Sequence, residues 1–225
     1  MGSALRQAFR VLGVSGSPIP RSNTDRALAV ALEASGCETE FVKLSDVRVA
    51  PCIACLRCVE TGRCVIEDDG IALAEKVRMA DALLVACYTP YSTVDARTKA
   101  FLERLYPLRH LRGSMRGKPG GAIVTSAIPE GCQQMPPAAA NGADAIRFYM
   151  LEEGMNFLGA VKILGNVPCI RCGHEDSCTM SGLKMIFGRD ASVDSVGVHD
   201  VEAQPLALAA AHELGRKIGR ALRGE

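Results

Sequence analysis

Five short strand-like runs that alternate with longer segments of helical spacing most limit what this chain can fold into. The runs cover residues 9–14, 38–44, 82–86, 121–125 and 160–164. Apolar residues at helical spacing predict helices over 23–35, 68–79, 95–106, a segment ending at 150, and 204–222. Strands that alternate with helices pair in parallel and are covered on both faces. The sequence therefore predicts an α/β fold, with residues 1–225 in one domain and an aperiodic stretch over 126–142.

The composition excludes several classes of protein. The chain is 48% hydrophobic and 23% charged, so it can bury a core without disulfides. Its net charge of +1 is too small for the basic surface that nucleic-acid binding needs. No apolar run approaches a membrane span, and the first ten residues lack a signal-peptide core, so we expect a cytoplasmic protein without membrane contact. In a reducing compartment, closely spaced cysteines among the ten indicate metal or redox chemistry.

The turn after the first predicted strand is rich in hydroxyl side chains. It contains Ser15, Ser17, Arg21, Ser22, Asn23 and Thr24. A helix N-terminus offers free amides and a partial positive charge, so this turn suits a phosphate group. It lacks the glycine patterns of dinucleotide and Walker loops, which leaves a mononucleotide such as FMN. The alternative is that Ser22, Asn23 and Thr24 only cap the helix.

Four cysteines follow a C-x2-C-x2-C-x5-C spacing in the loop 51–64. They are Cys52, Cys55, Cys58 and Cys64. Four thiolates within one short loop are typical of a 4Fe–4S site, whereas structural zinc prefers two separated pairs. The alternatives are free thiols or a zinc ion.

A second cysteine loop lies within residues 166–190. Cys169, Cys172 and Cys178 surround His174, a set that could hold zinc or a second cluster, or could be a structural loop. Cys132 could supply a fourth ligand. Cys37 and Cys87 are expected to be ordinary buried thiols. His110, His199 and His212 have no partner pattern, and the chain contains no visible Ser/His/Asp set or carboxylate pair.

Several motifs together resemble the flavodoxin-like NADPH-dependent FMN reductase superfamily, in its iron–sulfur flavoprotein branch. They are the Gly-Ser-Pro…Arg-Ser-Asn-Thr loop, the cysteine run that ends in Glu-Asp-Asp, the helix over 96–104, and the turn Gly131-Cys132-Gln133-Gln134. The resemblance implies a doubly wound five-stranded parallel sheet in the order 2-1-3-4-5, with FMN at the carboxyl edge where the strand order reverses. It also implies a homodimer or homotetramer with its cofactor sites close to subunit interfaces.

The loops after the third and fourth strands are expected to line the flavin ring. The candidates are Tyr88, Thr89, Pro90, Tyr91, Ser92 and Thr93 in the first loop, with Thr125, Ser126 and Gly131 at the second. This chain has Tyr88-Thr89-Pro90-Tyr91 where the family has Pro-x-Tyr-Phe, and Cys132 and Gln134 replace a glycine and an acid. Tyr88 and Tyr91 are the aromatic candidates in the first loop.

These features predict an FMN-dependent oxidoreductase that passes electrons between FMN and a 4Fe–4S cluster, with the cluster loop beside the phosphate loop. The donor is ferredoxin or NAD(P)H, and the acceptor is a small molecule or a protein. Two alternatives stay open. One is a cluster-free NAD(P)H-dependent FMN or quinone reductase, and the other is a non-enzymatic electron carrier or metal-binding module.

Overall fold

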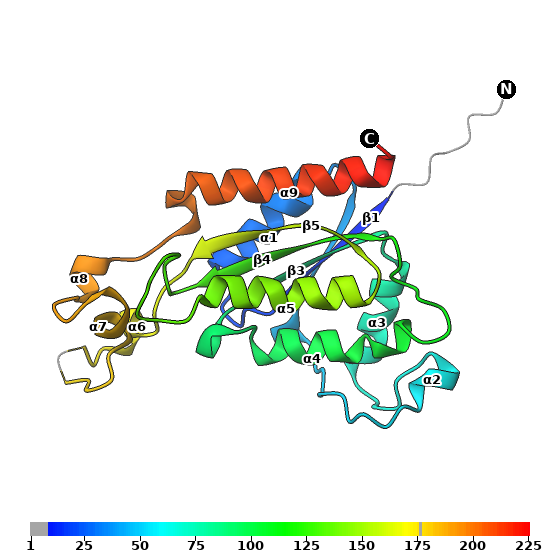
Figure 1. Ribbon diagram of the computed structural model, residues 1–225, viewed down its shortest axis with the longest axis horizontal. Helices are drawn as coiled ribbons and strands as arrows, with labels where there is room; N and C mark the ends of the chain where they lie inside the picture. Colours follow the sequence, from blue (N-terminus) through cyan, green and yellow to red (C-terminus); the bar gives the residue numbers. More distant parts are fainter. Residues whose placement is uncertain (1–8, 176) are drawn as a thin grey trace.

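One parallel sheet of five strands organises the chain, for which the computed structural model describes residues 9–175 and 177–225. The strands are β1 (Arg10–Ser15), β2 (Glu38–Lys43), β3 (Ala82–Tyr88), β4 (Pro119–Ser126) and β5 (Asn156–Leu164). Their order is β2-β1-β3-β4-β5, and every pairing is parallel (Figure 1). The predicted flavodoxin-like sheet is confirmed.

Helices cover both faces of this sheet. The longer ones are α1 (Asn23–Ala34), α3 (Asp69–Met79), α4 (Ala96–Arg104), α5 (Ala138–Glu152) and α9 (Pro205–Arg223). Short turns of helix are α2 (Cys58–Thr61), α6 (Cys169–Cys172), α7 (Gly182–Phe187), α8 (Val193–Val196), η1 (Leu44–Asp46), η2 (Pro90–Ser92), η3 (Tyr106–Leu108) and η4 (Val201–Ala203). One buried cluster joins α3, α4 and α5 to the sheet, and another joins α1 and α9 to its other face.

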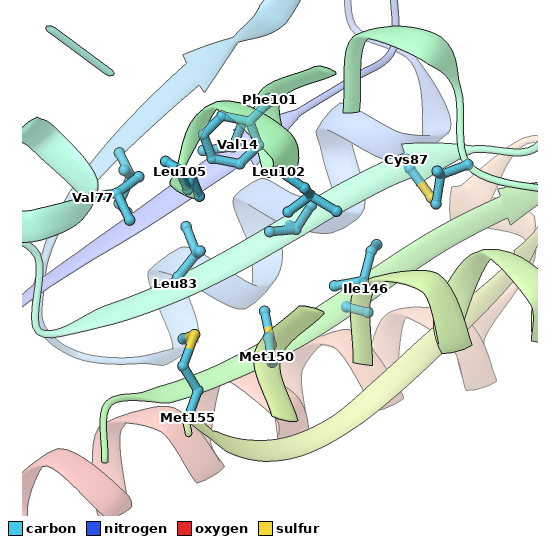
Figure 2. Close-up of a cluster of buried hydrophobic side chains, with 14 of the residues drawn as sticks. Val14, Val77, Leu83, Cys87, Phe101, Leu102, Leu105, Ile146, Met150 and Met155 are labelled. Atoms are coloured by element: carbon cyan, nitrogen blue, oxygen red, sulfur yellow. The ribbon is translucent and has the colours of Figure 1, made fainter. Parts of the chain in front are cut away.

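Strand β3 shows how the sequence divides between the two faces. Leu83, Val85 and Cys87 belong to the α4 side, whereas the residues between them belong to the α1 side. Side chains alternate along a strand, so a strand buried on both faces is apolar throughout. Figure 2 shows the first cluster, in which Leu83 of β3 lies between Phe101 of α4 and Met150 of α5, and Cys87 lies further along β3.

Helices α1 and α9 pack closely because α9 carries glycine at the contact. A Cβ atom on Gly215 would lie 2.0 Å from the carbonyl oxygen of Ala31, and one on Gly219 would lie 2.1 Å from that of Ser35. No side chain fits in this space. The two glycines therefore fix the separation of the two helices on this face.

Two predicted boundaries were wrong. Helix α5 begins at Ala138, inside the stretch that the sequence predicts as aperiodic, because its first turns are alanine-rich and carry no apolar stripe although alanine favours helix. Strand β5 begins at Asn156, earlier than predicted, and its first half is only partly buried. Within residues 9–175 and 177–225 no helix is long and apolar enough to cross a membrane. One domain over residues 1–225 stays a prediction.

Candidate functional site

The predicted phosphate loop runs from the end of β1 to the start of α1. The amide of Gly16 donates to the carbonyl of Ala86 at 2.8 Å, which continues the contact between β1 and β3. A Cβ atom on Gly16 would lie 2.0 Å from Oγ1 of Thr98 and 2.4 Å from Oδ2 of Asp95. Only glycine fits there. The loop thus sits directly on the N-terminus of α4.

The hydroxyl groups of this loop divide into two sets. Ser15 donates to Oδ1 of Asp25 at 2.6 Å, which uses its hydroxyl proton inside the protein. Ser22 is the N-cap of α1 and accepts from the amide of Asp25, and Ser17 accepts from the amide of Ile19 at 3.3 Å. A hydroxyl that accepts keeps its proton to donate. Ser17 and Ser22 can therefore donate to a phosphate, together with the first-turn amides of α1.

Asn23 and Thr24 have structural partners for their side chains. The amide group of Asn23 donates to the carbonyl of His199 at 2.7 Å and accepts from the amide of Val201 at 3.3 Å, so it holds the segment before α9. Thr24 hydrogen-bonds through its hydroxyl to that of Thr125 at 2.9 Å. Their backbone amides, as the first two residues of α1, have no partner within the helix. Arg21 is exposed and has a φ of 51°.

A charge pair lies beneath the loop. Lys43, at the end of β2, contacts Oδ2 of Asp25 at 2.5 Å and donates to the carbonyl of Ile19 at 3.0 Å. Asp25 also accepts from the amide of Ser22, so its carboxylate lies at the phosphate loop. Lys43 neutralises a negative charge that would otherwise repel a bound anion.

The loops after β3 and β4 meet beside the phosphate loop. Thr89 donates to the carbonyl of Thr125 at 3.4 Å, and Thr125 in turn meets Thr24. Tyr91 is fully exposed, whereas Tyr88 is partly buried and burial raises its pKa. Pro90 and Ser92 form η2 with Tyr91, and Thr93 ends it. The side chain of Ser126 pairs with the backbone of Ile128, and Gly131 has a φ of 82°.

Backbone strain is concentrated in these loops. Of the six non-glycine residues described with positive φ, five lie in the candidate loops: Arg21, Ala54, Leu56, Tyr91 and Ser92. Such conformations cost free energy and cluster where a loop is shaped for a ligand.

The four cysteines of the loop 51–64 surround one cavity of about 340 Å³. Its wall also includes Glu103 and Arg104 of α4, and it is otherwise largely apolar: Ile53, Ala54, Leu56, Val65, Ile66, Tyr106 and Pro107. In a 4Fe–4S cluster the cysteines surround the cluster, whereas ligands of a single ion converge on one point. Among residues 9–175 and 177–225, no three His, Cys, Asp or Glu side chains are grouped to hold one ion. Four thiols around an apolar cavity fit a cluster.

The backbone of this cysteine loop supports its thiols. Ala54 and Leu56 have positive φ values of 51° and 57°, which turn the chain between successive cysteines. The amide of Ala54 donates to the sulfur of Cys52 at 3.4 Å. Hydrogen bonds from Arg57, chiefly from its amide, lower the pKa of the Cys55 thiol. Burial raises the pKa of Cys58.

A buried ion pair closes the base of the cysteine loop. Arg104 and Asp68 are 1% and 3% exposed and are joined by two bonds of 2.7 Å. Asp68 also accepts from the amides of Ala50 and Gly70, at 2.7 Å and 2.9 Å. Burial opposes ionisation of Asp68, but the hydrogen bonds from Arg104 and the two amides outweigh it and lower its pKa.

The structure separates the cysteine cavity from the phosphate loop within one chain. Thr98, in the first turn of α4, touches the phosphate loop, whereas Arg104 at the end of α4 lines the cavity. Six residues of helix span about 9 Å along its axis. In Figure 1, α2 of this cysteine loop lies at lower right, whereas α6 and α7 of the second cysteine loop lie at the opposite end of the molecule. The two loops therefore contact opposite ends of α4, and the expectation that the cluster loop lies beside the phosphate loop stays a prediction.

The second cysteine loop forms a small packed unit of its own. Cys169 and Cys172 bound α6, where Cys172 is exposed and Cys169 packs with Val167 and Leu183. Cys178 is partly buried. Within the described residues these thiols form no ion-binding group with His174 or Cys132. Cys87 is buried, as expected, but Cys37 is only partly buried.

Three residues of these sites were missed by sequence reasoning. Lys43 could have been found as a cation at the carboxyl end of a strand next to β1. Arg104 and Asp68 could not have been found, because the sequence pattern places Arg104 within a helix and Asp68 at the start of another helix. Their pairing over 36 positions becomes visible only in the fold.

Comparison with known proteins agrees with this arrangement. Residues 9–155 match the family described as NADPH-dependent FMN reductase. An iron–sulfur flavoprotein of Methanocaldococcus jannaschii is 38% identical over 129 residues, which are 56% of this chain and 66% of that protein. One of Methanosarcina thermophila is 34% identical over 129 residues, which are 56% of this chain and 68% of that protein. The match thus spans about two thirds of these relatives.

A solved structure shares the fold across the chain. RosB with bound 8-demethyl-8-formylriboflavin-5'-phosphate superposes with a TM-score of 0.68 at 17% identity, and the match covers 96% of this chain and 80% of RosB. At this identity the likeness concerns the fold alone.

Proposed function

The chain belongs to the NADPH-dependent FMN reductase family, in its iron–sulfur flavoprotein branch, and we propose that it is an oxidoreductase that passes electrons between FMN and a 4Fe–4S cluster. The observation that carries the proposal is the cavity surrounded by Cys52, Cys55, Cys58 and Cys64. FMN accepts electrons in pairs or singly, so it can connect a two-electron reaction to a one-electron carrier.

The phosphate of FMN would be held at the start of α1. The amides of Asn23 and Thr24 and the hydroxyls of Ser17 and Ser22 supply donors, and Arg21 supplies an exposed positive charge. Ser15 and the side chain of Thr24 act by holding the loop in shape.

The isoalloxazine ring would lie against the loops after β3 and β4. Two hydrogen bonds support this position, one from Thr89 to Thr125 and one between Thr24 and Thr125. They hold the loops after β3 and β4 next to the loop after β1, and the strand order reverses between β1 and β3. The remaining expected ring contacts are Tyr88, Pro90, Tyr91, Ser92, Thr93, Ser126 and Gly131. Tyr88 is the better candidate for a ring contact than Tyr91, whose side chain faces solvent.

The cluster would be held by the four cysteines in the apolar cavity. The amide of Ala54 donates to sulfur there, and the cavity wall excludes water from part of the cluster surface. Hydrogen bonds to sulfur, net charge and exposure are what set the potential of such a cluster.

A second copy of the chain would bring the two cofactors together. The two sites lie at opposite ends of α4, and Ile53 and Leu56 at the cysteine cavity are 62% and 58% exposed. Exposed apolar side chains around a cofactor favour burial against a partner. We therefore propose a homodimer or homotetramer in which the cluster of one subunit faces the flavin of another.

The electron donor is proposed to be ferredoxin or NAD(P)H, and the acceptor a small molecule or a protein. Ferredoxin is a one-electron donor and would reach the cluster first, whereas NAD(P)H delivers a hydride and would reach the flavin first. Turnover with each donor in turn distinguishes them. The ten unpaired cysteines support a reducing, cytoplasmic location.

A second metal site stays a prediction for Cys169, Cys172 and Cys178. Replacement of Cys172 by alanine should lower the metal content per chain and leave the first site unchanged. An unchanged metal content would show that these cysteines belong to a structural loop and bind no metal.

The visible spectrum of protein purified without oxygen tests the proposed function. We expect flavin bands over a broad iron–sulfur absorbance. Cys55→Ala should abolish the broad absorbance, and Cys37→Ala, outside both loops, should leave it unchanged. A flavin spectrum without the broad band would favour a cluster-free FMN or quinone reductase, and a chain without flavin would contradict the proposal.

A further inference from the structure

The guanidinium of Arg104 has five N–H donors, and four of them have partners at the base of the cysteine loop. One terminal nitrogen donates to Asp68 at 2.7 Å and to the carbonyl of Ala50 at 2.9 Å. The other donates to Asp68 at 2.7 Å and to the carbonyl of Ile66 at 3.2 Å. Arg104 thereby ties together the two chain segments that flank the four cysteines.

The fifth donor, Nε of Arg104, is buried and has no hydrogen-bond partner. The residue is 1% exposed, so water does not reach this N–H. A buried donor of a charged group without an acceptor is costly and requires an explanation. The other four donors face the loop base, which leaves Nε for a different acceptor.

The cavity beside Arg104 contains sulfur atoms. Arg104 lines it together with Cys64 and the other three cysteines. The Asp68 carboxylate raises the pKa of Arg104, burial opposes this, and the neighbouring Cys64 adds to the increase. Sulfur atoms bound to iron are good acceptors for N–H groups, and such bonds tune the cluster.

We propose that the Nε–H of Arg104 donates to a sulfur of the cluster site, either the thiolate of Cys64 or an inorganic sulfide, and so raises the reduction potential of the cluster. The inference rests on the proposed 4Fe–4S cluster. Arg104 contacts the cluster site directly, whereas Asp68 and the two carbonyls position its guanidinium at the cavity.

The direction of the effect follows from charge. One-electron reduction adds one negative charge to the cluster and its ligands. An N–H donor and a fixed cation stabilise the more negative state, so they raise the potential. The negative charge of Asp68 partly cancels the effect of the Arg104 charge on the potential. It does not cancel the effect of the hydrogen bond from Nε–H to sulfur.

Arg104→Lys is the variant that separates the contact from the ion pair. Lysine keeps the positive charge for Asp68 but has no Nε–H in this position. Arg78→Lys is the control for loss of a guanidinium–carboxylate pair away from the cavity, because Arg78 also makes two hydrogen bonds to one carboxylate, that of Glu75, on the exposed face of α3. Iron and acid-labile sulfide are measured first, and then the midpoint potential by redox titration of the cluster signal.

We expect Arg104→Lys to retain iron and to show a more negative midpoint potential than the wild type, with Arg78→Lys unchanged. An unshifted potential at full iron content would overturn the inference. Wild-type protein without iron would overturn both this inference and the proposed function, whereas iron in the wild type with no shift overturns only the role of Arg104.

A second measurement uses the unaltered chain and decides the matter if Arg104→Lys does not fold or loses its cluster. Protein labelled with 15N at arginine Nε should show a 15N coupling to the reduced cluster in pulsed electron paramagnetic resonance. Arg57→Lys and Arg63→Lys should each retain this coupling, which shows that it does not come from either arginine of the loop itself. Absence of any such coupling would contradict the proposed contact.

Discussion

Lys43 and Asp25 form an ion pair of 2.5 Å beneath the phosphate loop, although they lie at the ends of different elements, β2 and α1. The pair is 13% and 10% exposed. Lys43 neutralises the carboxylate of Asp25, which shapes the loop. This carboxylate therefore does not repel the anion that the loop would bind.

Lys43→Met should weaken FMN binding. The uncompensated charge of Asp25 would then face the phosphate, and we expect a roughly tenfold increase in Kd, or about 1.4 kcal/mol. Fluorescence titration of apoprotein with FMN measures it. Asp25→Asn in the same chain should restore most of the affinity, and a double variant as weak as Lys43→Met alone would contradict the charge argument.

Ser22→Ala should have two separate effects. It removes the N-cap of α1, at a cost of about 1 kcal/mol of unfolding free energy, and it removes one donor to the phosphate, which raises the FMN Kd about ten- to a hundredfold. Ser192→Ala removes the same kind of cap from α8, which contributes no residue to the phosphate loop, and should leave FMN affinity unchanged. Equal FMN affinity in Ser22→Ala and wild type would reduce Ser22 to a helix cap.

Asp68→Asn should destabilise the protein in a pH-dependent way. The variant leaves Arg104 without its counter-charge in a buried site, which costs about 3–5 kcal/mol at neutral pH. The pKa of Asp68 is lowered on folding, so its stabilisation is fully present above the unfolded-state pKa, near pH 4, and is lost as the pH falls through the folded pKa.

Urea unfolding of wild type and Asp68→Asn between pH 7 and pH 2 measures this difference. The two unfolding free energies should converge in acid. A difference that stays constant over the whole range would show that ionisation of Asp68 does not contribute.

Gly215→Ala should destabilise the protein even though alanine favours helix more than glycine does. Its Cβ would meet the carbonyl of Ala31 at 2.0 Å, so α9 must move away from α1, at a cost of about 1–3 kcal/mol. Thermal unfolding compares it with Ala209→Gly on the exposed side of α9, which should cost about 0.5–1 kcal/mol. A stabilised Gly215→Ala would mean that the helices do not touch there.

The sequence predicted the sheet because strands buried on both faces carry a continuous apolar run. Val11 and Val14 of β1 show this, since they face different helices and are both fully buried. The start of α5 was missed because alanines such as Ala139 give no periodic contrast between apolar and polar faces, although Ala139 is buried against the sheet.

The sequence predicted which loops form the candidate sites, but not the contacts that join these loops to distant parts of the chain. The spacing of the four cysteines located the cavity, because these ligands are close in sequence. The role of Asn23 was not accessible, since its partner His199 lies 176 positions away. The separation of the two sites depends on the path of the cysteine loop along α4, which no local pattern encodes.

We propose that Cys52, Cys55, Cys58 and Cys64 hold a 4Fe–4S cluster in a flavin-binding chain. This is tested by measuring iron, acid-labile sulfide and FMN per chain in wild type and Cys58→Ala, both purified without oxygen. We expect about four iron and four sulfide in the wild type, with FMN bound, and loss of iron but retention of FMN in Cys58→Ala. FMN with no iron, or one zinc ion in place of iron and sulfide, would contradict it.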